Sequence, residues 1–178
     1  MRALHELRAA HVAVGGTGPG RRTATQQLNH AYAVLVMGQF QGFCRDLHSE
    51  AADALSRAVQ PSELASVFRV SLTTARALDR GNPTAGTIGS DFGRFGVQFW
   101  PEVYEHDSRN GGRRAKLDAL GHWRNAIAHQ DFTASVVTGR SLNRDTVESW
   151  FGACHGLAQS FDIVVGDQIR RLIGRQPW

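Results

Sequence analysis

The chain has very little lysine and very little cysteine. Lys116 is its only lysine, and every other member of its 20 lysine and arginine residues is an arginine. The two cysteines, Cys44 and Cys154, both fall on apolar faces of expected helices. Two thiols in 178 residues exclude the dense disulfide framework of a small secreted domain. We therefore expect both to be small core side chains in a reducing compartment.

Long hydrophobic runs are also missing. No segment approaches the roughly 20 uninterrupted apolar residues that a helix needs to cross a bilayer. Residues 1–7 are charged from Arg2 onward and lack the apolar core of a signal peptide. These absences argue against a membrane-spanning protein and against a membrane partner. We expect a soluble cytoplasmic protein.

Acidic residues are fewer than basic ones, which gives a formal net charge of +4. The planar guanidinium of arginine binds phosphate through two parallel hydrogen bonds, so the near-exclusive use of arginine is consistent with a phosphate-bearing partner. A GC-rich genome, which favours arginine codons, gives the same composition. The charge therefore permits a nucleic-acid partner without establishing one.

Helical periodicity dominates what is present. Apolar residues recur every three or four positions over residues 23–58, and again from Val147 to Leu172. Asn143 is placed to cap the second of these helices, and Gly174 follows its end. We predict a single all-α domain over residues 1–178, a bundle of four to six helices with two long antiparallel members.

Shorter elements are expected before and after the first long helix. Residues 1–14 predict a short helix, and the glycine-rich residues 15–20 predict a flexible connector. Another helix is expected to begin at Pro61, which suits a first helical turn. Its apolar stripe continues to Leu78, and Gly81 is a plausible left-handed cap.

Residues 81–112 predict an irregular insertion loop with short helical turns inside it. The loop is rich in aromatic residues and is therefore expected to pack onto the domain; they are Phe92, Phe95, Phe99 and Trp100. It is also a candidate for substrate or partner specificity, with three arginines that could contact phosphates: Arg109, Arg113 and Arg114. Residues 110–112 predict a turn, residues 113–129 a helix, and residues 133–138 a short extended piece.

The helix over residues 113–129 ends in the sequence Arg-Asn-Ala-Ile-Ala-His, residues 124–129. An apolar stripe runs along the same helix into this sequence; it is formed by Leu117, Leu120, Trp123 and Ile127. At about 100° per residue, Arg124 lies inside this stripe, whereas Asn125 and His129 share a face on the far side. A guanidinium keeps its proton inside a protein, so Arg124 needs an anionic partner or an opening to a ligand. This break in the pattern marks a candidate functional site.

The three polar side chains suit metal-free cleavage of RNA. The imidazole of a histidine ordinarily exchanges its proton near neutral pH, so His129 could transfer a proton. Arg124 could hold a phosphate and stabilise the negative charge that develops on it. Asn125 could orient the histidine or hydrogen-bond the scissile group. In this reaction the 2′-hydroxyl attacks the neighbouring phosphate, a base takes its proton and an acid protonates the leaving 5′-oxygen.

One helix does not complete such a site. Arg124 and His129 are about 140° apart around the helix axis, and one histidine cannot easily be both base and acid in the same step. Two copies of the helix, facing each other across a two-fold axis, would place two arginines and two histidines around one cleft. The catalytic interpretation therefore requires a homodimer.

A structural role could explain the same motif. A histidine at a helix end can interact with the last carbonyls and the helix dipole. Arg124 could form an ion pair with Asp46 or Asp118. Both cysteines fall on apolar stripes of expected helices, so nucleophilic catalysis has little support. Four further histidines have no metal-ligand spacing, and no metal or cofactor is predicted; they are His48, His106, His122 and His155.

The motif Arg-Asn-x-x-x-His, near the end of a late helix in an all-α chain, resembles the HEPN superfamily (higher eukaryotes and prokaryotes nucleotide-binding domains). Residues 117–129 and 29–47 are similar to two helices of its RiboL-PSP-like group, which is associated with RNA-targeting defence. The resemblance covers most of the chain from Leu28 onward. It implies a metal-independent endoribonuclease with a toxin, abortive-infection or phage-defence role, active as a homodimer and restrained by an antitoxin or sensor protein.

The resemblance assigns the catalytic roles to Arg124 and His129, and the polar position after the arginine to Asn125. Many relatives carry a glutamate on the early long helix, and the matching position here is Gln41, which cannot act as a base or pair its charge with Arg124. Asp46, on another face of that helix, is the carboxylate that could replace it. Some relatives are inactive binding modules, so the alternative is a catalytically silent HEPN domain that binds nucleotide, RNA or a partner protein. An unrelated helical regulator is a third interpretation.

Overall fold

The computed structural model describes residues 6–7, 9–10, 13, 23–133, 137 and 141–178. These ranges contain six α-helices, two short 3-10 helices and no strand, which confirms the predicted all-α class. Most of the predicted N-terminal helix and extended piece, and all of the connector, lie outside the described residues. The elements in chain order are α2 (Thr23–Ser56), η1 (Ser62–Leu64), α3 (Ala65–Thr73), η2 (Ala77–Asp79), α4 (Ala85–Gly93), α5 (Phe99–His106), α6 (Asn110–His129) and α7 (Arg144–Ile173).

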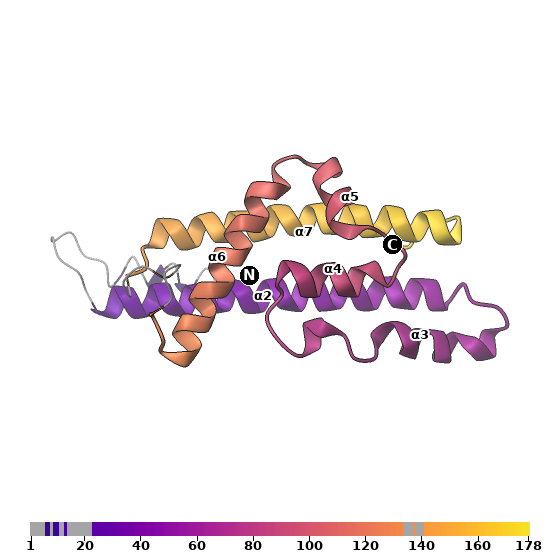
Figure 1. Cartoon of the computed structure of the whole chain (residues 1–178), viewed down its shortest axis with the longest axis horizontal. Coiled ribbons are helices and arrows are strands. Elements are labelled where there is room, and N and C mark those ends of the chain that lie inside the picture. The colour runs from indigo at the N-terminus through magenta and orange to yellow at the C-terminus, as the bar shows by residue number, and fades with distance from the viewer. Residues whose placement is uncertain (1–5, 8, 11–12, 14–22, 134–136, 138–140) are drawn as a thin grey trace.

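The two long helices, α2 and α7, lie side by side and run in the same direction (Figure 1). Near the start of both, the Asn29 side-chain amide donates a hydrogen bond of 2.7 Å to the carbonyl of Leu142, just before α7. Near the end of both, Ala54 and Ile173 line one hollow. The predicted antiparallel arrangement is therefore wrong. Residues 57–143 bring the chain back to the starting end of α2, so α7 begins where α2 begins.

The predicted N-terminal cap and the predicted end of the last helix are confirmed. The side-chain oxygen of Asn143 accepts a hydrogen bond of 2.8 Å from the backbone N–H of Thr146. Gly174 has a φ of +72°, the left-handed conformation that favours glycine after a helix. Together these caps satisfy backbone groups that the two ends of α7 leave without intrahelical partners.

The helix predicted from Pro61 to Gly81 is shorter than expected. It ends at Thr73, because Ala75 adopts a φ of +56° and turns the chain. The guanidinium of Arg94, directly after α4, donates to the carbonyls of Leu72, Thr74 and Ala75 and so caps α3 from outside. The expected left-handed cap at Gly81 is also wrong, since the glycines with positive φ in the described ranges are Gly96 and Gly174.

The predicted loop over residues 81–112 contains two helices, α4 and α5, and the first turn of α6. Its aromatic residues do pack onto the domain: Phe92, Phe95 and Phe99 are buried. The turn predicted at residues 110–112 is helical because Asn110 is fully buried. Its side-chain amide donates to the carbonyl of Val103 and to the hydroxyl of Ser160, at 2.8 and 3.0 Å.

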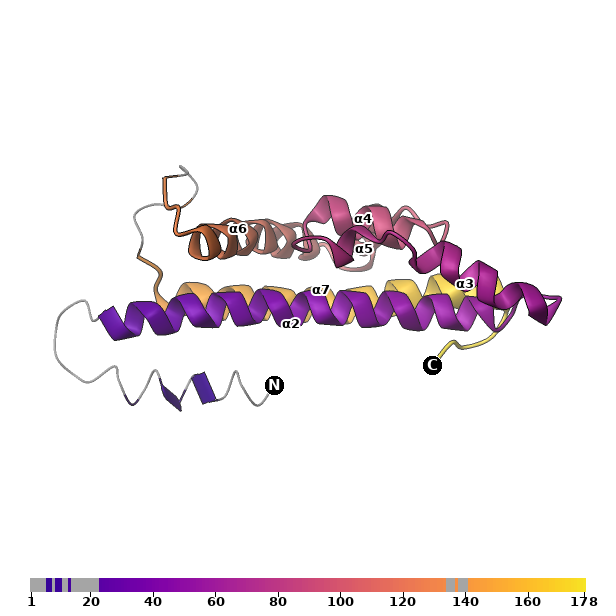
Figure 2. The ribbon, with the colours of Figure 1, turned by 90° about the horizontal axis from the view of Figure 1, so that it is seen from below.

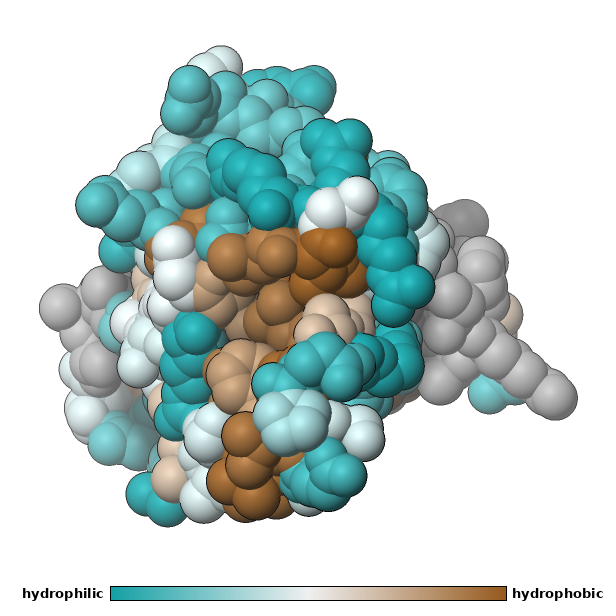
Figure 3. Space-filling view, turned by 90° about the vertical axis from the view of Figure 1, so that its right-hand side faces the viewer, coloured by the Kyte–Doolittle hydropathy of each residue, from teal (hydrophilic) through white to brown (hydrophobic). Residues whose placement is uncertain are grey.

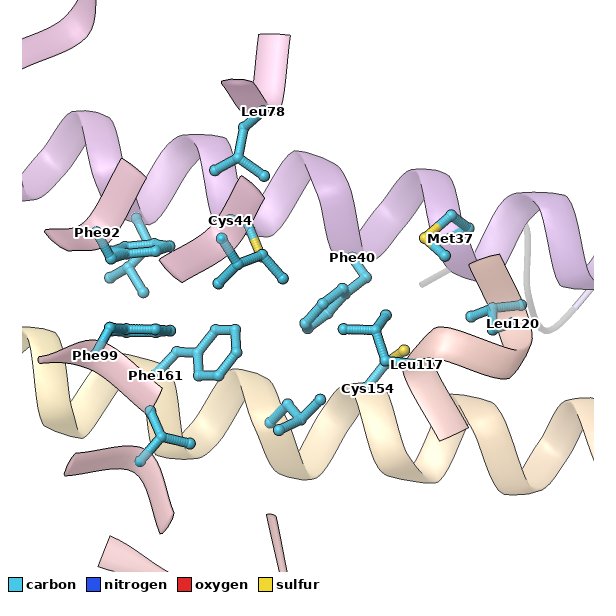
Figure 4. Close-up of a cluster of buried hydrophobic side chains, with 14 of the residues drawn as sticks. Met37, Phe40, Cys44, Leu78, Phe92, Phe99, Leu117, Leu120, Cys154 and Phe161 are labelled. Carbon is cyan, nitrogen blue, oxygen red and sulfur yellow. The ribbon is translucent and has the colours of Figure 1, made fainter. Parts of the chain in front are cut away.

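The helices form two layers (Figure 2). The pair α2 and α7 makes one layer, α4, α5 and α6 lie on one side of it, and α3 flanks α2. Buried side chains from both layers make one core (Figure 4), labelled there as Met37, Phe40, Cys44, Leu78, Phe92, Phe99, Leu117, Leu120, Cys154 and Phe161. Both cysteines are free and buried, as predicted, and burial raises the pKa of Cys154 to about 12.

Apolar side chains are exposed at the end of the molecule that carries α3 and the end of α7 (Figure 3). They include Leu64, Val67, Val70 and Leu172, each more than half accessible to solvent. Among the described helices, none combines the length and the apolar character that crossing a membrane requires.

Candidate functional site

Helix α6 crosses the layer of long helices, and its C-terminal end projects beyond α2 (Figure 1). Leu117 and Leu120, in its middle, are fully buried. Arg124 and Ile127 are only half-buried, and His129 is exposed. The sequence pattern placed Arg124 inside the apolar stripe, but the side chains buried at this end of α6 are those of Trp123 and Ala126, and Arg124 is left partly accessible. The motif therefore lies on an accessible helix end.

Arg124 has no carboxylate within ion-pair distance in the part of the chain that the structure describes. Its one hydrogen bond there joins a guanidinium Nη1 to Oδ1 of Asn125, over 3.4 Å. The suggested ion pairs with Asp46 and Asp118 are not formed. Asp46 is exposed, and it lies about 24 Å farther along α2 than His30, the α2 residue that contacts Trp123 of α6. A half-buried cation without an anionic partner is available to an anionic ligand.

Asn125 is held by a residue from another part of the chain. Its Oδ1 accepts a hydrogen bond of 2.5 Å from Nδ2 of Asn82, and also the longer one from Arg124. It does not contact His129, so the expected orienting role toward the histidine is not seen. Its own Nδ2 has no hydrogen-bond partner among the described residues. Asn125 thus links Arg124 to Asn82 and keeps one free donor.

His129 is the last residue of α6. The following residue, Gln130, has a φ of +53° and ends the helix in the left-handed conformation. Asp131 lies near the imidazole: hydrogen bonds from Thr133 lower the pKa of this carboxyl, and the charge of His129 acts in the same direction. No hydrogen bond to the imidazole is formed within residues 23–133 or 141–178. The ring is therefore accessible to a second molecule.

Gln41 occupies a structural position next to the site. Its side-chain amide donates to the carbonyl of Leu78 at 2.8 Å and to the carbonyl of Gly81 at 2.6 Å. These bonds fasten the start of the segment 80–84 to α2. Because Asn82 directly follows Gly81, Gln41 positions the residue that holds Asn125.

A hollow of about 310 Å³ lies beside Asn125, between α2, the segment 80–84 and α6. We call it the α6 pocket. Its apolar lining consists of Met37, Pro83 and Leu117, and its other lining residues are Asn82, Thr84, Asp118, Gly121, His122 and Asn125.

Three of these polar residues were not identified as site residues from the sequence: Asn82, Thr84 and His122. Asp118 was expected only as a possible ion-pair partner of Arg124. A signal for Asp118 and His122 was present. Asp118, His122, Asn125 and His129 recur at steps of three or four residues, which places them along one exposed face of a helix. His122 was considered only as one of four histidines without metal-ligand spacing. Nothing in the local sequence could have placed Asn82 there, because its contact with Asn125 crosses from one segment to another.

The arginines near the start of α6 are engaged with neighbouring side chains. Arg109 and Arg113 both pair with the carboxylate of Asp107, with a closest distance of 2.8 Å in each case. Arg114 lies over the ring of Trp100 and donates to the hydroxyl of Tyr104 at 2.6 Å. They therefore help to fix the start of α6 on α5, at the opposite end of the helix from His129.

No group of three histidine, cysteine, aspartate or glutamate side chains in the described ranges is arranged to hold a metal ion. Comparison with protein-family models, with curated proteins and with solved structures gives no match for this chain. Membership of the HEPN superfamily therefore remains a prediction from the motif and the helix order.

Proposed function

We propose that this chain is a metal-independent endoribonuclease of the HEPN type, and that the projecting end of α6 supplies half of a composite site in a homodimer. The observation that carries the proposal is the state of Arg124, which is half-buried and has no carboxylate partner among the described residues. His129 is exposed on the same projecting end. A phosphate of RNA supplies the anion that Arg124 lacks.

The proposed reaction is an internal transfer at phosphorus. The neutral imidazole of one subunit's His129 takes the proton of a 2′-hydroxyl, and the freed oxygen forms a bond to the neighbouring phosphorus. The bond from phosphorus to the 5′-oxygen breaks, and the protonated imidazole of the partner subunit's His129 gives its proton to that oxygen. The products are a 2′,3′-cyclic phosphate and a 5′-hydroxyl, so the cleavage step consumes no water.

The remaining residues position the charged groups. Arg124 contacts the phosphate oxygens and stabilises the additional negative charge of the five-coordinate state. Asn125 fixes the guanidinium through the hydrogen bond between them, and Asn82 fixes Asn125. By this account Gln41 needs no charge, because its task is to hold the segment that carries Asn82.

A toxin, abortive-infection or phage-defence role follows from the resemblance. A nuclease that cuts the RNA of its own cell has to be restrained, and an antitoxin or a sensor protein is the expected partner. The exposed end of α6 is the surface that such a partner has to cover or separate in order to block a dimeric site.

The test is cleavage of a mixed-sequence single-stranded RNA by the purified protein in excess EDTA. We expect wild type to cut and both Arg124→Ala and His129→Ala to lose about a hundredfold or more of the rate. His106→Ala is the matched control, because His106 is also an exposed histidine at the end of a helix. Circular dichroism of each variant shows whether the fold is kept.

The alternative is a catalytically silent HEPN domain that binds nucleotide, RNA or a partner protein. It predicts a dimer that cuts no RNA. Light scattering on the wild type separates this outcome from a third one, a strictly monomeric protein, which contradicts the composite site altogether.

A further inference from the structure

We propose that the α6 pocket holds one nucleobase of a single-stranded RNA, and that it prefers guanine. This inference rests on the proposed ribonuclease function, since it assigns a base-binding position to the same substrate. The pocket shares Asn125 with the group that contacts Arg124. A base in the pocket therefore lies directly beside the proposed phosphate position.

The size and lining of the α6 pocket suit a single base. Its volume of about 310 Å³ is at the lower end of the range for small-molecule sites. Met37, Pro83 and Leu117 are themselves buried and form the apolar base of the hollow, on which the flat face of a ring can rest. Recognition of single-stranded RNA typically combines such a surface with polar groups that contact the edge of the base.

Asp118 is the group that favours guanine. It is exposed at the rim and forms no ion pair or hydrogen bond within the described residues. An ionised carboxylate only accepts hydrogen bonds, through two oxygens. The Watson–Crick edge of guanine presents two adjacent donors, at N1 and at the 2-amino group. Adenine, cytosine and uracil each present one donor there, next to an acceptor that a carboxylate repels.

Asn125, two helical turns beyond Asp118 on the same face of α6, supplies a complementary donor. Because its Oδ1 is occupied by Asn82, its Nδ2 is the group left to bind a ligand. The N7 edge of guanine carries acceptors and lies opposite the edge that Asp118 would bind. The carboxylate and the amide thus match opposite edges of the same base.

The position of the α6 pocket also fits the path of a single RNA strand along α6. Asp118, His122, Asn125 and His129 follow one another on a single exposed face of α6. A strand laid along this face, with one base in the pocket, brings its adjoining phosphate toward Arg124 and His129.

Gly121 gives a way to close the pocket without disturbing the fold. A Cβ atom at this position meets only the Cε of Met37, at 3.6 Å, which is ordinary contact. Leucine is a good helix former, so Gly121→Leu fills the hollow and leaves α6 helical. Gly152→Leu is the matched control, because Gly152 is exposed in α7 and a Cβ atom there meets nothing within 4 Å.

The experiment measures binding in the His129→Ala background, so that cleavage does not interfere. Short single-stranded RNAs that carry one guanine, adenine or hypoxanthine in a uracil strand are titrated by fluorescence anisotropy. We expect guanine to bind about tenfold more tightly than adenine. Hypoxanthine, which lacks the 2-amino group, is expected to fall between them.

The variants assign that preference to the pocket. Asp118→Asn should bring the affinities for guanine and adenine together, and Gly121→Leu should remove the preference while Gly152→Leu keeps it. Equal affinity for guanine and adenine in the parent protein, or a preference that Gly121→Leu leaves intact, overturns the proposal.

The two proposals can fail separately. If guanine is preferred through Asp118 and the wild type cuts no RNA, the ribonuclease proposal is wrong and the base-binding pocket stands. If the wild type cuts RNA at every base and Asp118→Asn changes neither cleavage nor binding, the pocket proposal is wrong and the ribonuclease proposal stands.

Discussion

The Nδ2 of Asn82 lies 2.5 Å from Oδ1 of Asn125, and this hydrogen bond ties the segment 80–84 to the motif of α6. Gln41 holds the same segment to α2 through the carbonyl of Gly81. Arg124 is connected to this pair through Asn125. The guanidinium is therefore positioned by residues from three separate parts of the chain.

Removing the Asn82 hydrogen bond should affect activity more than stability. In Asn82→Ala, Asn125 loses its fixed partner and Arg124 loses its support, so we expect RNA cleavage to fall about tenfold or more. The pair is at the surface, and the free energy of unfolding should change by no more than about 0.5 kcal/mol. Steady-state cleavage and urea unfolding measure the two effects. Asn82→Asp, which has the same shape but cannot donate, should lose activity to a similar extent; full activity in both variants contradicts the positioning role.

Introducing glutamate at position 41 should destabilise the protein. The side chain of Gln41 donates to two carbonyl oxygens, and a carboxylate in its place can donate to neither and is repelled by both. We expect Gln41→Glu to lower the free energy of unfolding by about 1–3 kcal/mol. Gln39→Glu is the matched control, since Gln39 is exposed on the same helix. An unchanged stability together with increased cleavage would show instead that position 41 acts as the glutamate of HEPN relatives does.

Asp91 should be essential for the stability of the turn at Ala77 and Leu78, which precedes the segment 80–84. Its carboxylate is fully buried and accepts hydrogen bonds from the backbone N–H groups of Ala77 and Leu78, at 3.0 and 2.8 Å. Asp91→Ala leaves both donors without their acceptor, and we expect a loss of about 2 kcal/mol or more in urea unfolding. Asp91→Asn keeps one acceptor oxygen and should lose less. Equal losses in the two variants would mean that the hydrogen bonds are not the source of the effect.

His48 should make stability depend on pH in mildly acidic solution. Its ring is buried between Phe92 and Phe95, and Nε2–H donates to the carbonyl of Asp91 over 3.1 Å. Burial, and secondly the nearby charge of Arg76, lower the pKa of His48 from 6.5 to about 4. Below pH 6.5 the unfolded chain therefore binds a proton that the folded protein excludes until about pH 4.

The destabilisation by His48 is absent above pH 6.5. The free energy of unfolding falls as the pH decreases from 6.5 to about 4, because the unfolded chain alone binds the proton in this range. The slope from this one residue is at most about 1.4 kcal/mol per pH unit. Urea unfolding at a series of pH values measures it, with His48→Gln as the comparison. If the variant has the same slope as the wild type, the protonation of another group causes the dependence.

The long helices could be predicted from the sequence because each has an uninterrupted apolar stripe. The predicted end at Ala58 is close to the observed one at Ser56, and Asn143 and Gly174 mark the last helix through local capping chemistry. The direction of α7 relative to α2 could not be predicted in the same way. It depends on the path of the whole connection between them, which no local pattern encodes.

The bounds of the shorter helices could not be predicted, for physical reasons that the structure makes clear. The end of α3 is set by Arg94, which lies about 20 residues later and satisfies its last carbonyls. Helices α4 and α5 have nine and eight residues, too few for a helical period to stand out from the glycines around them. The first turn of α6 depends on the burial of Asn110 against Ser160 of α7.

The candidate site was predicted in part. The sequence pattern singled out Arg124, Asn125 and His129, and the structure places all three at one accessible helix end. Its periodicity could not show that α6 projects beyond α2, so the enclosure of Arg124 was overestimated. Gln41 was assigned to the glutamate position of HEPN relatives by resemblance. Its hydrogen bond to the segment 80–84 joins residues far apart in the sequence, so no local pattern could predict it.

The proposed site uses both copies of His129 in one shared cleft, and a mixed dimer tests this most directly. Wild type and His129→Ala subunits that carry different affinity tags can be coexpressed, and the mixed dimer isolated by two successive purifications. If one imidazole is the base and the other the acid, the mixed dimer should cleave RNA in EDTA about a hundredfold more slowly than wild type, close to the rate of the His129→Ala homodimer. A mixed dimer with half of the wild-type rate would mean that each subunit works alone, and it would contradict the composite site.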